Sequence, residues 1–99
     1  MASSRWKWAK NAKVVSDLTG IGEAEIMGKG RAAEVVDARW MVVKLVREAG
    51  YYPSQIAQVM GMTVRQVQAI ITSFDMRLRF SDPLVRINYE TAANHLRSN

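Results

Sequence analysis

The sequence predicts a compact all-α domain of five or six helices. Apolar residues recur mostly at spacings of three and four, which is the period of helices that bury one face. Only two prolines and six glycines interrupt the 99 residues, and without cysteine the chain can form neither a disulfide nor a thiolate metal site. We interpret residues 1–11 as a basic lead-in that contains the start of the first helix, and residues 12–97 as one helical domain.

The first half of the chain is predicted to hold two longer helices with a short turn between them. The first runs from about Ser4 to Leu18 and Gly20 ends it, with Trp8, Ala12, Val15 and Leu18 on its packing face. A helical turn within residues 21–27 precedes the long helix 31–48, which ends at Gly50. The long helix has a wide apolar arc, so it should be central and buried on most sides. Its arc consists of Val35, Val36, Val42, Val43 and Val46, flanked by Trp40 and Leu45.

Three more helices are predicted in the second half, over residues 54–60, over residues 64–80 and from Pro83 onward. Thr63 and Gln66 have the spacing of a capping box, which places a helix start directly after Thr63. Asp82 followed by Pro83 combines an N-cap residue with proline at the first helical position. The expected inward faces are Val67, Ile70, Ile71, Phe74 and Leu78, and then Val85, Tyr89, Ala92 and Leu96.

Residues 53–71, PSQIAQVMGMTVRQVQAII, have the spacing of a helix-turn-helix. Ala57 is the small residue at which the helices would cross, and Gly61 can adopt the left-handed backbone of the turn. We favour DNA binding over a plain αα-corner, because Arg and Gln are side chains that read guanine and adenine in the major groove. The expected apolar struts are Ile56, Met60, Val67 and Ile70, and the expected outward residues are Thr63, Val64, Arg65, Gln68, Ala69 and Thr72.

The net charge of +5 favours a polyanionic partner, although solubility alone would also explain it. The segment GKGR, residues 28–31, places exposed amides and two cations before a helix, which suits a phosphate; a plain turn with solvated cations fits equally well. It is not a nucleotide-binding P-loop, because the spacing from Gly22 to Gly28 is one residue too long and Gly30 replaces the required Ser or Thr. We therefore expect no ATP binding.

Three isolated residues receive separate interpretations. Arg39 lies among the valines of the long helix, so it must pair internally, the commoner outcome, or reach past the helix edge to an anion. Trp8 should be core, whereas Trp6 could stack on bases or on a partner and is left open. We expect His95 to be solvated.

We expect no enzymatic activity, metal or cofactor, because the chain has no Ser/His/Asp arrangement, paired acid–base carboxylates or HExxH motif. The basic start has no apolar stretch behind it that would make a secretion signal, and no run is long enough to span a membrane. We expect a monomeric, cytoplasmic and nucleoid-associated protein.

From about Ala12 to Leu96 the chain resembles the C-terminal DNA-binding domain of the bacterial replication initiator DnaA. VVSDLTGIGEAEIMGKGR resembles that family's first helices and basic loop, and VVDARWMVVKLVREAG its long helix. YYPSQIAQVMG resembles the first helix of its helix-turn-helix, and NYETAANHL its closing helix. The resemblance implies that Lys29 and Arg31 contact phosphates, that Arg39 enters a minor groove, and that Arg65, Gln66 and Gln68 lie near base edges or the backbone.

The chain departs from the initiator family at the head of the recognition helix. The family's Arg-Asp-His-Thr-Thr signature is absent, and the corresponding segment reads Met62-Thr63-Val64-Arg65-Gln66. The DNA sequence that is read should therefore differ, and no ATPase domain accompanies it. Two alternatives stay open: a protein-interaction adaptor, favoured by an exposed Met62 and Val64, and a dimeric regulator of the Trp-repressor type.

Overall fold

The computed structural model describes residues 2–97, with side chains from Trp8 onward. This part of the chain is all-helical, which confirms the predicted fold class. The Trp6 side chain, left open by the sequence, lies outside the described side chains. The helices are α1 (Ala2–Thr19), α2 (Glu23–Ile26), α3 (Ala33–Glu48), α4 (Pro53–Met60), α5 (Val64–Phe80) and α6 (Pro83–Arg97).

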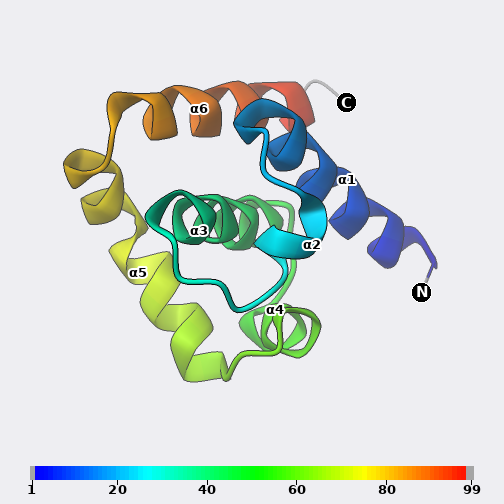
Figure 1. Cartoon of the computed structure of the whole chain (residues 1–99). Helices are drawn as coiled ribbons and strands as arrows, with labels where there is room; N and C mark the ends of the chain where they lie inside the picture. The colour runs from blue at the N-terminus through cyan, green and yellow to red at the C-terminus, as the bar shows by residue number, and fades with distance from the viewer. Residues whose placement is uncertain (1, 98–99) are drawn as a thin grey trace.

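Helix α3 lies in the middle of the molecule, and each of the other five helices packs against it (Figure 1). Val42, Val43 and Val46 are completely shielded from solvent. Because β-branched residues lose side-chain freedom in a helix, contacts with neighbouring helices must stabilise α3. The prediction of a central, mostly buried long helix is confirmed.

Helix α1 departs from its predicted packing face at one end. Trp8, Ala12 and Val15 are buried as expected, but Leu18 is exposed. The helix ends one residue later, and Ile21 packs against the core after the turn at Gly20. Helical period alone placed Leu18 inward, because the sequence does not show where the neighbouring helices stop.

Helix α6 closes the bundle and is held to α3 by a polar contact as well as by packing. The Tyr89 hydroxyl donates a hydrogen bond to Glu48, and its ring packs edge-on against Phe74 at a centroid distance of 4.8 Å. Burial and the Glu48 carboxylate both raise the pKa of Tyr89, so the hydroxyl stays protonated as a donor. Within residues 2–97, none of the helices is both long and apolar enough to cross a membrane.

The turn between α4 and α5 depends on the backbone of Gly61. Its φ of +66° is left-handed, and the amide of Met62 donates to the Ala57 carbonyl at 2.9 Å. A Cβ atom at Gly61 would meet no other group within 4 Å. The turn therefore requires glycine for its backbone angle and not for lack of space.

We predict that Gly61→Ala lowers the free energy of unfolding by about 1–2 kcal/mol, because alanine is strained at positive φ. Gly22→Ala is the matched control, since Gly22 has extended backbone with φ −61° and room for a Cβ. The control should stay within about 0.5 kcal/mol of the wild type. Urea unfolding measures both, and equal losses would contradict the role given to the Gly61 backbone.

Candidate nucleic-acid interface

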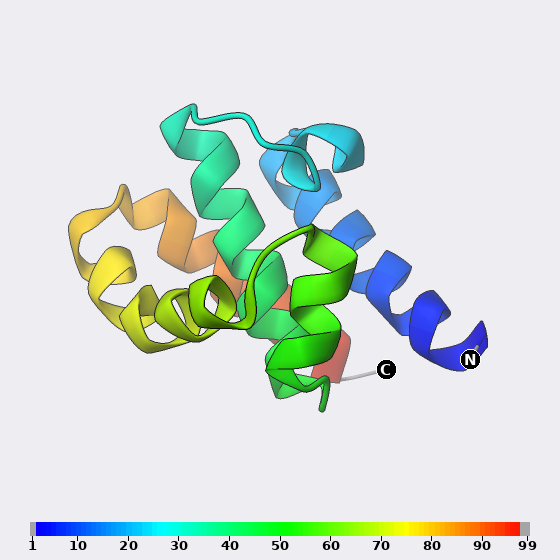
Figure 2. The same cartoon turned by 90° about the horizontal axis from the view of Figure 1, so that it is seen from below.

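Helices α4 and α5 form the predicted helix-turn-helix. Viewed from below in Figure 2, they run in different directions across the same face and are joined by the short turn. Ala57 is 5% exposed at the crossing, which confirms the expected small residue. The struts joining the helices are all buried: Ile56, Met60, Val67 and Ile70.

The start of α5 is fixed by a reciprocal cap. Thr63 Oγ1 accepts a hydrogen bond from the Gln66 amide at 3.1 Å, and the Thr63 amide donates to Gln66 Oε1 at 2.9 Å. Both predicted capping partners are thus in place, and two amides of the first turn are satisfied. The cap occupies the oxygen of the Gln66 side chain, which leaves its Nε2 group as the part that could meet DNA.

One face of α5 is exposed to solvent. Arg65, Gln68, Ala69 and Thr72 are all exposed, and their spacing of i, i+3, i+4 and i+7 puts them on a single stripe. Val64 stands beside them at the head of the helix and is 41% exposed. The structure therefore gathers on one surface the side chains that the sequence expected to face outward.

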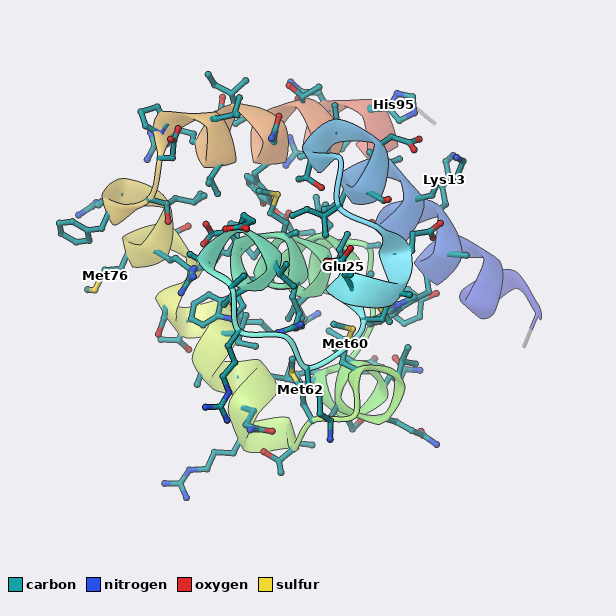
Figure 3. All side chains as sticks on the ribbon, viewed as in Figure 1. Lys13, Glu25, Met60, Met62, Met76 and His95 are labelled. Atoms are coloured by element: carbon teal, nitrogen blue, oxygen red, sulfur yellow. The ribbon has the colours of Figure 1, made fainter. Side chains whose placement is uncertain are left out.

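Met62 differs from its expected position. The sequence placed it exposed beside Val64, but it is half-buried and packs against the core next to the buried Met60 (Figure 3). The thioether side chain of Met62 is flexible enough to fold inward from the turn and fill a gap beside the core. One of the two observations that favoured an adaptor is thus wrong.

The basic segment GKGR lies between α2 and α3. Figure 1 shows it running along the side of α3 on which α4 and the start of α5 also lie. Lys29 and Arg31 are both exposed. A Cβ at Gly28 would lie 3.1 Å from the Ala24 carbonyl, so glycine allows the chain to pass close to the end of α2.

Arg39 anchors this segment from inside. Its Nε donates to the Ile26 carbonyl and its Nη1 to the Gly30 carbonyl, both at 2.9 Å, and its Nη2 donates to the Glu25 carbonyl at 3.3 Å. The residue is only 8% exposed. The internal partner expected from the sequence is present, as main-chain carbonyls of α2 and of the segment that follows it. The guanidinium therefore faces the chain's own backbone, unlike the minor-groove contact that the resemblance implied.

The described residues outside this face include a histidine and carboxylates that could in principle bind a metal. His95 lies exposed near the end of α6 (Figure 3). Among the described residues, no three His, Cys, Asp or Glu side chains gather as they would around a metal ion.

Comparison with known families supports the helix-turn-helix. Residues 33–78 match the family model of a homeodomain-like domain. The matched segment runs from the start of α3 through α4 to near the end of α5, the three helices that build and support the turn. Geometry and match together define a helix-turn-helix domain, a class that typically binds DNA and carries no enzymatic activity. No curated protein matches the chain.

We predict that Arg39→Met lowers the free energy of unfolding by about 2 kcal/mol, because three carbonyls lose a charged donor. The amides of residues 28–32 should also exchange hydrogen faster. Arg65→Met is the control: it removes an exposed guanidinium and should change stability by less than about 0.5 kcal/mol. Urea unfolding and hydrogen exchange measure these effects, and wild-type exchange in Arg39→Met would contradict the anchoring role.

Proposed function

We propose that the protein binds double-stranded DNA with a sequence preference, with α5 in the major groove and the 28–31 segment on phosphates. The observation that carries the proposal is the exposed stripe on α5, which begins at a rigidly capped helix start. Polar side chains that project from such a helix can reach base edges.

Within this proposal the α5 residues divide by chemistry. Arg65 and Gln68 donate to base edges, since they suit guanine and adenine respectively. Val64, Ala69 and the Thr72 methyl group pack against thymine methyl groups. Thr63 and Gln66 lie at the helix head, where the positive end of the helix dipole favours a phosphate.

Phosphate contacts would set the orientation of the domain on the duplex. Lys29 and Arg31 supply them, because both are exposed on the segment beside α3. Arg39 acts indirectly, since its three hydrogen bonds hold the backbone that carries these two cations. We propose this positioning role in place of a direct minor-groove contact by Arg39.

The resemblance to the DNA-binding domain of the initiator DnaA supports a shared way of docking on DNA. It makes replication initiation in a bacterial nucleoid the first process to consider. The altered segment Met62–Gln66 implies a different target sequence. A Trp-repressor-type regulator is the second candidate, and the exposed apolar side chains described in the next subsection favour it.

Selection of bound duplexes from a random library, followed by a salt titration of the enriched sequence, tests the function. We expect an enriched motif and an affinity that falls steeply with salt, because each phosphate contact releases counterions. Weak, salt-independent binding without an enriched motif would overturn the proposal. The protein-interaction adaptor would then be the remaining candidate function.

We predict that Lys29→Ala lowers the affinity for every duplex by the same factor. It should also reduce the slope of log affinity against log salt concentration by about 1. Arg65→Ala should instead cost about 1–3 kcal/mol at one base pair and relax the preference there. Lys13→Ala is the control, since Lys13 lies on α1 away from the helix-turn-helix (Figure 3). Binding isotherms across a salt series measure all three, and equal effects of Lys13 and Lys29 would contradict the assigned docking face.

A further inference from the structure

The corner between α5 and α6 exposes large apolar side chains that the DNA-binding proposal does not use. Phe80 is 84% exposed, Met76 66%, and Leu84 and Ile87 are each 57% exposed. Figure 3 shows Met76 directed away from the body of the molecule. Two helix ends thus present apolar groups to water on one surface, a feature typical of an interaction site.

A hollow of about 790 Å³ opens beside these side chains. Its lining includes Ile21, Trp40, Met41 and Val85 from the core side, while Phe80 and Leu84 also border it. The size lies within the range of pockets that bury side chains or ligands. Projecting apolar groups and a cavity that could receive them are therefore adjacent on the same face.

The charged groups of this corner nearly balance. Arg77 pairs with Asp37 and its guanidinium lies 4.7 Å from the centroid of the Trp40 ring, so this pair is fixed at the hollow. The remaining carboxylates at the lining are Glu34 and Asp82, and the same helix ends carry the exposed Arg79 and Arg86. Asp75 on α5 is also exposed, so four carboxylates stand against three guanidinium groups here, and the chain's excess of positive charge lies elsewhere.

We propose that this corner is the contact between two copies of the chain, related by a two-fold axis, with Phe80 of each copy in the hollow of the other. A two-fold contact needs a surface that complements itself, and a projection beside a cavity meets that need. A mixed set of acids and bases lets identical surfaces pair opposite signs, whereas the basic remainder of the chain would repel a second copy. The proposal replaces the monomer expected from the sequence.

The position of the corner leaves the DNA-binding face free. Helix α5 has 17 residues, so its last turn lies about 24 Å from the capped start at Thr63. Carboxylates and apolar groups make the corner itself a poor surface for phosphates. A pair of chains would carry two helix-turn-helix units to one duplex, a consequence that rests on the proposed function, whereas the pairing itself does not.

Sedimentation equilibrium from micromolar to millimolar protein, without DNA, tests the pairing. We expect the mass of the wild type to rise with concentration toward twice that of the monomer. Phe80→Glu should weaken the association at least about tenfold, because it places a charge in the apolar contact. Since Phe80 is exposed, the variant should fold, and Phe80→Ser, which adds no charge, should weaken the association in the same direction.

Val59→Glu is the matched control, because Val59 is an apolar residue 52% exposed on α4. It should associate like the wild type. In the wild type, amide NMR shifts that depend on concentration should be confined to residues 19–21, 33–41 and 73–88. A wild type that stays monomeric at millimolar concentration, or a Phe80→Glu variant that associates normally, would overturn the inference. If the chains pair but bind no DNA, the inferred pairing stands and the proposed function fails.

Discussion

The packing of α3 against every other helix is the constraint on which the rest of the structure depends. Its valines contribute little to helix formation by themselves, so α3 is stable only while its neighbours cover it. The same contacts fix those neighbours: α5 rests on α3 with its polar stripe turned outward, and α6 is tied to it through Tyr89 and Glu48. Through Arg39, α3 also holds the backbone of the basic segment. One buried helix thus positions both parts of the candidate DNA-binding face.

Features governed by local interactions could be predicted from the sequence. The start of α5 follows from Thr63 and Gln66, and the turn follows from Gly61, because a cap and a left-handed backbone involve only nearby residues. Features that depend on distant helices could not be predicted. The inward fold of Met62 and the exposure of Leu18 depend on where other helices end. The carbonyl partners of Arg39 depend on the path of residues 25–30, for which the sequence has no periodic signal.

The two ends of α5 differ in chemistry. Its N-terminal half presents polar and cationic groups from a capped start, whereas its last turn and the start of α6 present apolar groups among mixed charges. The sequence predicted the first end well, because each residue there has a recognisable role. At the second end the helical period left Met76, Phe80 and Leu84 off the expected inward faces, but only the packed structure shows that they lie together beside a hollow.

The anchoring of residues 25–30 by Arg39 has a consequence for how the protein can change. All three partners of the guanidinium are main-chain carbonyls, which every amino acid provides. The side chains of Lys29 and Arg31 take no part in the anchor. Substitutions at these two positions can therefore alter the charge that the segment offers to DNA while the path of its backbone is preserved. Arg39 holds the backbone of this segment, whereas Lys29 and Arg31 supply its charge. Natural variation or design can therefore change the charge of the segment without altering the fold of the domain.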